Sequence, residues 1–149
     1  MTGGTRHVLA SEELVYKECE QYLPLRDGDV VYCIKNYDGD TCTIAWVDHR
    51  GQKVRSSCRI KGIDTPELRA SSKEVKALAT RAKIRLRDAV VGEFVTIRDP
   101  GKDKYNRVLA GLETEKIGSV AEYMLADPEI CKPYQGDKKK SWSVHIINK

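Results

Sequence analysis

The chain has 149 residues, of which 40% are hydrophobic and 32% are charged, and its formal net charge is +4. This length and composition predict one globular domain with a buried core. No apolar run approaches the roughly 20 residues that span a bilayer, which excludes a helical membrane protein. The mildly basic charge is compatible with a nucleic-acid partner but does not require one.

The first 28 residues form a segment of their own. A short helix is predicted over residues 12–22, with Ser11 as its N-cap and Pro24 after its end. We therefore separate residues 1–28, an N-terminal extension, from residues 29–149, the main domain.

Five strands and two helices are predicted within the main domain. The strands are predicted at residues 30–34, 41–47, 54–63, 94–98 and 107–112, and the helices at residues 71–90 and 120–125. Asp38-Gly39 indicates a hairpin between the first two strands, and Gly62 suggests a bulge near the end of the third. Antiparallel strands with an inserted helix predict an α+β fold, a five-stranded OB-fold β-barrel with packed helices.

The cysteines indicate a reducing environment. No two of them have the C-x-x-C spacing of a zinc or redox site. They are Cys19, Cys33, Cys42, Cys58 and Cys131. We interpret them as reduced, mostly buried thiols of an intracellular protein. Residues 1–7 are not followed by the apolar segment of a signal peptide, which agrees with that expectation.

Three short polar stretches carry the chemistry, and each has a plainer interpretation. Asp38-Gly39-Asp40-Thr41 can be a hairpin turn without any further role. The place of Asp40 at the start of a strand, where its side chain is fixed, favours a functional role. Asp64-Thr65-Pro66-Glu67 can be a helix start, with Asp64 as the N-cap and Glu67 completing a capping box. Residues 103–107, Asp-Lys-Tyr-Asn-Arg, can be a solvated loop between strands.

Taken together, the three stretches supply what the cleavage of a phosphodiester needs. Asp40 and Asp64 can share a Ca²⁺ ion, with the Thr65 carbonyl oxygen and water completing its shell. Glu67 is then a carboxylate that the metal does not use, and it can serve as a general base. A second set of side chains contacts the nucleotide. Arg59 and Arg107 can each fork onto phosphate oxygens, Lys104 adds a point charge, and the Tyr105 ring can stack on a base.

Basic residues gather in two further places. Residues 69–87 contain seven of them against Glu74 alone, and the tail contains Lys138, Lys139 and Lys140. Each group is either a solvated face or a surface for nucleic acid.

The three stretches, in this order and around these predicted elements, resemble the staphylococcal-nuclease-like (thermonuclease) family. The resemblance covers roughly residues 29–135. It implies an OB-fold enzyme that cleaves DNA and RNA with Ca²⁺ and leaves 3′-phosphate ends. It implies Asp40, Asp64 and the Thr65 carbonyl as metal ligands, and Glu67 as the base. Arg59 and Arg107 match the phosphate-binding arginines, and Lys104 and Tyr105 match residues that contact the nucleotide.

The chain departs from the family in some positions. Glu129 and Cys131 stand where the family has two tyrosines near the nucleotide, and the family's bacterial enzymes are usually secreted and poor in cysteine. We expect a monomeric, Ca²⁺-dependent, sugar-non-specific endonuclease that acts on DNA and RNA without a membrane partner. The alternative is a nuclease-like domain that binds nucleic acid without cutting it. Loss of catalysis in such a domain is expected at Arg59, Glu67 or Arg107, and all three are present.

Overall fold

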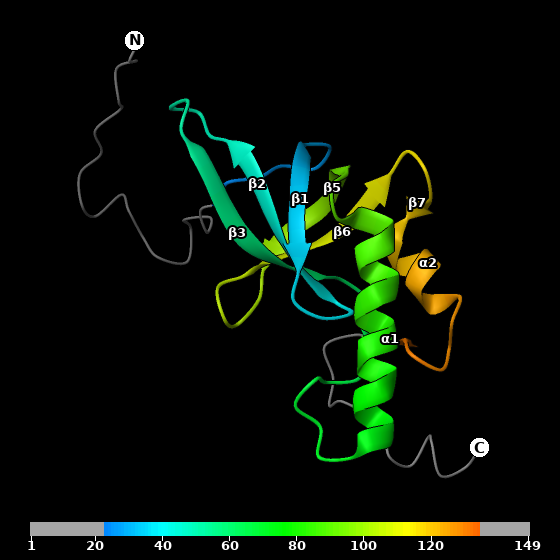
Figure 1. The fold of residues 1–149 in the computed structure, drawn as a ribbon. Coiled ribbons are helices and arrows are strands. Elements are labelled where there is room, and N and C mark those ends of the chain that lie inside the picture. The colour runs from blue at the N-terminus through cyan, green and yellow to red at the C-terminus, as the bar shows by residue number, and fades with distance from the viewer. Residues whose placement is uncertain (1–22, 135–149) are drawn as a thin grey trace.

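The computed structural model describes residues 23–134, a β-barrel with two helices beside it (Figure 1). The helix predicted over residues 12–22 and the lysines at 138–140 lie outside the described residues. Cys19 also lies outside them. The separation of residues 1–28 from the rest stays a prediction, although Leu25 is already part of the buried core.

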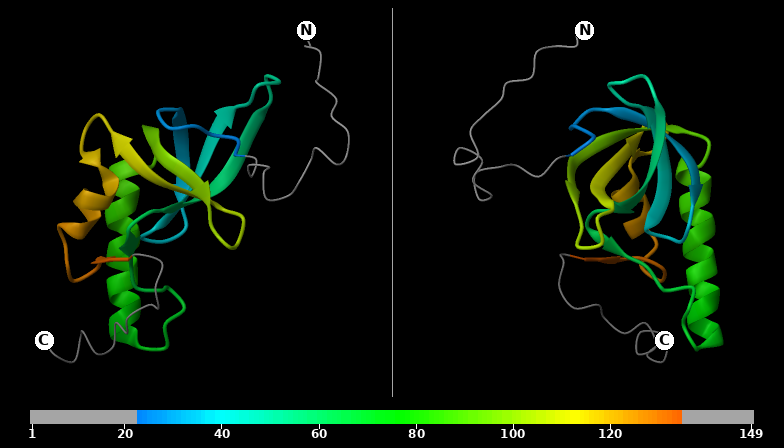
Figure 2. Two further views of the ribbon diagram at one scale, coloured as in Figure 1. Left: turned by 180° about the vertical axis from the view of Figure 1, so that it is seen from behind. Right: turned by 90° about the vertical axis from the view of Figure 1, so that its left-hand side faces the viewer.

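Five strands form the barrel. They are β1 (Val30–Asn36), β2 (Thr41–Val47), β3 (Lys53–Ile60), β5 (Phe94–Lys102) and β6 (Val108–Thr114). Their order is β3-β2-β1-β5-β6, and a parallel pairing between β3 and β6 closes the barrel. Figure 2 shows the closed arrangement from two further sides. The predicted α+β fold, an OB-type barrel with packed helices, is confirmed.

Two helices pack beside the barrel. The long helix α1 (Lys73–Val90) begins after Ser72, whose side chain accepts a hydrogen bond from the Val75 N–H. Its buried positions recur at helical spacing: Val75, Ala79, Ala82, Leu86, Ala89 and Val90. The last four of these belong to the hydrophobic core. The short helix α2 (Val120–Leu125) begins in the same way after Ser119. Both helices lie where the apolar periodicity predicts them.

Three short strands and one break differ from the sequence-based prediction. The strand predicted over residues 54–63 ends at Ile60, because Gly62 has a φ of +83° and turns the chain. The chain then enters β4 (Ile63–Asp64), which pairs with β8 (Lys132–Pro133). A third short strand, β7 (Gly118–Ser119), pairs with β6. Strands of two residues carry too little periodicity to be found from sequence.

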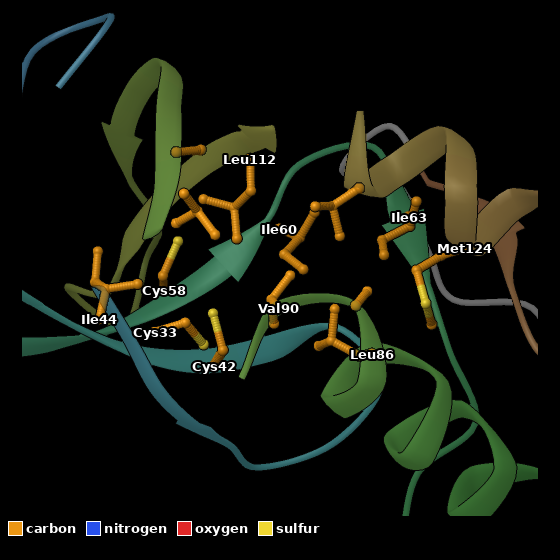
Figure 3. Close-up of a cluster of buried hydrophobic side chains, with 14 of the residues drawn as sticks. Cys33, Cys42, Ile44, Cys58, Ile60, Ile63, Leu86, Val90, Leu112 and Met124 are labelled. Atoms are coloured by element: carbon orange, nitrogen blue, oxygen red, sulfur yellow. The ribbon is translucent and has the colours of Figure 1, made fainter. Parts of the chain in front are cut away.

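The barrel interior is a mixed core of aliphatic side chains and thiols. Figure 3 shows Cys33, Cys42 and Cys58 among Ile44, Ile60 and other aliphatic residues. These three cysteines and Cys131 are free and buried, as expected for the described part of the chain. Cys42 and Cys58 are direct partners across β2 and β3, one residue from Thr41 and Arg59 respectively. The end of this core therefore supports the polar residues described next.

Candidate active site

The turn between β1 and β2 holds the first carboxylate in a fixed position. Asp40 is buried, with 5% of its surface exposed. One of its oxygens accepts a hydrogen bond from Thr41 Oγ1 at 3.0 Å, and the other accepts one from Thr65 Oγ1 at 3.2 Å. The turn itself is closed by the Asp38 side chain, which accepts from the Asp40 N–H at 3.0 Å. Asp40 thus links the turn to the segment after β4.

Gly39 is required here by close packing. A Cβ atom on Gly39 would lie 2.7 Å from Ala82 Cβ and 2.8 Å from Thr65 Oγ1. Contacts that short do not occur between real side chains, so the turn could not lie this close to α1 with any other residue. The residue that the sequence marks as a hairpin glycine therefore brings Asp40, Thr65 and α1 together.

The second carboxylate is held by the small sheet below the barrel. Asp64 lies in β4 opposite Lys132 in β8, and its residue surface is 3% exposed. Thr65 is buried as well. The helix begins after Ser72, so the interpretation of Asp64 as an N-cap is wrong. Asp64 instead ends β4, and residues 65–67 belong to the irregular segment that leads from β4 to α1.

Arg59 lies between the two carboxylates. Its Nη2 atom is 3.5 Å from Asp40 Oδ2 and 3.9 Å from Asp64 Oδ1, and its Nη1 donates to the Ile60 carbonyl at 2.8 Å. The Arg59 side chain is only 9% exposed. Its guanidinium also lies over the Tyr134 ring, 5.6 Å from the ring centroid. One buried cation here offsets only part of the charge of two buried anions, so the set keeps an excess of negative charge.

The second arginine reaches the site through barrel closure. The parallel register pairs Arg59 with Leu109, so Arg107 comes to the same edge of the barrel. Asp103 accepts from Arg107 Nε at 2.6 Å and from the backbone N–H groups of Arg107 and Tyr105 at 2.9 Å each. Burial tends to raise the pKa of Asp103, but the hydrogen bonds from Arg107 and Tyr105 outweigh it and lower that pKa.

One cleft collects these residues. Its volume is about 1210 Å³. Seven of the predicted site residues line it: Asp40, Arg59, Thr65, Glu67, Lys104, Tyr105 and Arg107. Asp64 is not among the lining residues and lies buried behind the Arg59 guanidinium. Glu67 and Tyr105 are exposed on the cleft wall.

Some residues that line the cleft were not predicted as site residues from the sequence. Among them are Tyr37, Arg69 and Tyr134. The Tyr134 N–H donates to the Gly62 carbonyl at 2.9 Å, which continues the pairing of β4 with β8. No local pattern in Lys132-Pro133-Tyr134 indicates that this run pairs with the distant residues 62–64.

The two positions that depart from the family do not line the cleft. Glu129 forms an ion pair with Arg81 of α1 at 3.2 Å, and Cys131 is buried. Burial, with the negative charges of Asp40 and Asp64, raises the pKa of the Cys131 thiol to about 12. Aromatic rings are instead supplied to the cleft by Tyr37, Tyr105 and Tyr134.

The carboxylates of the β1–β2 turn also affect each other's charge. Burial and the negative charge of Asp40 raise the pKa of Asp38 to about 6. Asp38 therefore changes its charge within the range in which proteins are commonly assayed. The cleft combines a negative corner at the β1–β2 turn with cationic groups on the wall formed by Arg59 and residues 103–107.

The donor set fits a hard cation. Asp40 and Asp64 both direct an oxygen at Arg59 Nη2, so the two carboxylates already face one point, and a guanidinium nitrogen stands in for the cation there. Carboxylate and carbonyl oxygens are the ligands that Ca²⁺ prefers. Within residues 23–134, no cluster of three or more His, Cys, Asp or Glu side chains is arranged around a metal position. The Thr65 carbonyl and water would have to complete the shell.

Comparison with known proteins agrees with this geometry. The sequence model of the staphylococcal nuclease homologue family matches residues 57–127. Over these residues the chain is similar to the staphylococcal nuclease homologue family. The match runs from β3 to the turn after α2 and includes Arg59, Glu67 and Arg107, while Asp40 lies before it. A search of curated proteins found no match.

The match over residues 57–127 confirms the resemblance seen in the sequence. A nuclease-like family implies nucleic acids as the class of substrate. No helix among the described residues is long and apolar enough to cross a membrane.

Proposed function

We propose that the chain is a Ca²⁺-dependent nuclease that hydrolyses phosphodiester bonds in DNA and RNA. The observation that carries the proposal is the convergence of Arg59, Glu67 and Arg107 on one cleft, beside the two buried carboxylates. These residues come from three separate segments of the chain. A turn, a helix start or a solvated loop would each explain one segment but not their meeting.

The metal would be held by Asp40, Asp64 and the Thr65 carbonyl oxygen. Ca²⁺ bound there supplies charge neutralisation beside the phosphate and helps to order water. Because the Arg59 guanidinium lies between the two carboxylates, it has to move when the metal binds. That movement would free its planar donors for a phosphate group.

The chain's own residues supply the rest of the chemistry. Glu67 is exposed in the cleft and is proposed to accept the proton of the attacking water. Arg59 and Arg107 would donate to the non-bridging phosphate oxygens, on which negative charge grows in the transition state. Lys104 adds positive charge at the entrance, and the Tyr105 ring, which is 68% exposed, can stack on a base.

A binding module without catalysis is the second candidate. A domain that had lost catalysis would have no reason to keep a carboxylate and two guanidinium groups around one cleft. Because Glu67, Arg59 and Arg107 all line the cleft, the arrangement favours the enzyme.

Digestion of single-stranded DNA, duplex DNA and RNA tests the proposal. Each would be incubated with the full chain in Ca²⁺, in Mg²⁺ and in chelator, beside the variants Glu67→Gln and Glu115→Gln. Glu115 is exposed and lies outside the cleft, so it is a matched control. A positioned base contributes about 10²–10⁴-fold in rate, and Glu67→Gln should lose that much while its thermal unfolding is unchanged.

The other outcomes are equally informative. Full cleavage in excess chelator would contradict the metal role of Asp40 and Asp64. Cleavage by a pure Glu67→Gln preparation at the wild-type rate would remove Glu67 from the mechanism. A shift of nucleic acid in a gel without any cleavage would establish the binding module instead.

A further inference from the structure

The two flanks of α1 differ in what holds their basic residues. On one flank, Arg81 forms ion pairs with Asp127 and Glu129 at 3.1 and 3.2 Å. Arg85 lies 4.0 Å from the Tyr123 ring centroid and donates to the Tyr123 carbonyl. These two arginines attach α1 to α2 and the turn after it. The basic residues of this flank thus have a structural role.

The opposite flank carries lysines with no such role. Lys73, Lys76 and Lys83, which we call the lysine flank, fall within an arc of about 80° on the helix. Within residues 23–134 none of the three forms an ion pair. The two acidic residues of α1, Glu74 and Asp88, fall outside this arc, about 100° and 60° from Lys73 around the helix axis.

Arg87 also falls on this side of the helix, but its guanidinium contacts the Asp88 carboxylate at 3.3 Å. It is therefore left out of the lysine flank. The three lysines remain as positive charges without partners among the described residues.

None of the three lysines lines the cleft, but segments that do line it adjoin α1 next to the lysine flank. Asn36 Nδ2 donates to the Lys83 carbonyl at 2.9 Å, and Gly39 packs against Ala82, so the β1–β2 loop lies on the middle of α1. Tyr37, in that loop, lines the cleft and is 56% exposed. At the other end, Arg69 lines the cleft four residues before Lys73. Figure 1 shows both segments on the same side of α1, opposite α2.

We propose that the lysine flank binds the phosphate backbone of a polynucleotide that extends out of the cleft past Tyr37. The three lysines span about 15 Å along the helix axis, a length over which one strand of duplex DNA carries about four phosphates. Lysine suits a contact that follows the backbone without reading bases, because its ammonium is a point charge on a flexible stem. This inference rests on the proposed function for its substrate class.

A pair of triple variants tests the lysine flank. The first replaces Lys73, Lys76 and Lys83 by Gln in the Glu67→Gln chain, which keeps a bound strand uncut. The matched control replaces Lys53, Arg55 and Lys116 by Gln in the same chain. These three residues are exposed and lie outside the cleft. Their replacement by Gln removes the same amount of positive charge as the first variant does. Lys53 and Arg55 lie at the far end of β3 from Arg59, about 13–20 Å away along the strand.

The measurement is the affinity for a labelled single strand of about 20 nucleotides between about 50 and 200 mM NaCl. Three lost phosphate contacts should reduce the slope of log affinity against log salt by about 2, since each contact contributes about 0.7. The control should keep the slope of the parent chain. A dinucleotide is too short to reach the lysine flank, so the first variant should lose affinity for the long strand but not for the dinucleotide. The control variant should show no such difference.

Equal slopes for both triple variants would overturn the proposal and show that the lysine flank is a solvated face. That result is separate from the fate of the proposed nuclease. Binding is measured in a chain that need not cut, while cleavage is measured in the digestion assay. If the chain binds with the expected slope but never cuts, the proposal for the lysine flank stands and the proposed nuclease activity is contradicted.

Discussion

The two halves of the cleft are built differently. The half at the β1–β2 turn and β4 is buried, and there the Arg59 guanidinium is shared by the carboxylates of Asp40 and Asp64. The half at residues 103–107 and Glu67 is open: Tyr105 is exposed, and the Arg107 side chain is 33% exposed against 9% for Arg59. One half is a buried set of charged side chains that contact one another, and the other half presents its side chains to solvent.

The difference predicts two kinds of variant. A substitution in the buried half removes a partner from charges that water cannot reach, so it should affect folding as well as activity. A substitution in the open half removes a group whose charge is screened by solvent, so it should affect activity alone.

Arg59→Met should show the largest effect. It leaves Asp40 and Asp64 buried without their shared cation, and breaking a buried ionic set in this way costs about 3–5 kcal/mol. Urea unfolding in chelator measures this free energy. Added Ca²⁺ should then stabilise the variant more than the wild type, because the metal replaces the lost charge. An unfolding midpoint equal to that of the wild type would show that the two halves do not differ in this way.

Arg107→Met is the matched change in the open half. We expect a fall in kcat of about 10²–10³-fold, the range seen when one transition-state donor is removed. The free energy of unfolding should change by less than about 1 kcal/mol, since the Arg107–Asp103 pair is partly exposed. Single-turnover cleavage and urea unfolding would separate these effects. A loss of stability as large as that of Arg59→Met would contradict the comparison.

Gly39→Ala should have an intermediate effect on folding. The new Cβ would lie 2.7 Å from Ala82 Cβ, and overpacking of this kind costs about 1–3 kcal/mol. Ala82→Gly removes the clashing atom, so the double variant should recover part of the loss beyond the additive expectation. A double-mutant cycle in urea measures this coupling. Additive effects would mean that the contact with α1 does not require Gly39.

The smallest effect concerns pH. The folded-state pKa of Asp38 is about 6, raised by burial and by Asp40 from an ordinary value of 3.8. The folded state therefore binds this proton more tightly than the unfolded state does. Its contribution to stability is fully present below pH 3.8 and is lost as the pH rises through about 6. In chelator, Asp38→Asn should be less sensitive to pH over this window, and identical curves for both proteins would refute the assignment.

Much of the fold is encoded locally. Helical spacing predicts α1 to within two residues of its N-terminus, and alternation predicts β2 at its exact bounds, because each pattern repeats several times along one segment. The barrel type follows from the order of the elements. Its closure does not, because the pairing of β3 with β6 joins residues about 50 positions apart, and no local pattern marks that register.

The site is encoded in part. The residue types and their spacing identify seven of the residues that line the cleft, because hard oxygens and guanidinium groups suit few other tasks. The burial of Arg59 beside two carboxylates could not be predicted, since it depends on how the chain turns at Gly62 between β3 and β4. Tyr134 was missed for a similar reason: its position comes from the distant pairing of β4 with β8. Long-range pairing is what a single sequence shows least.

The pairing of β4 with β8 also bears on how the protein is made. Asp64 sits in β4, and the strand beside it ends at Pro133, almost at the end of the described residues. A chain still emerging from the ribosome therefore lacks that neighbour until residue 133 has been added, long after β4 itself has been made. On the proposed function, the part of the cleft that holds Asp64 is therefore completed only after β8 has been synthesised.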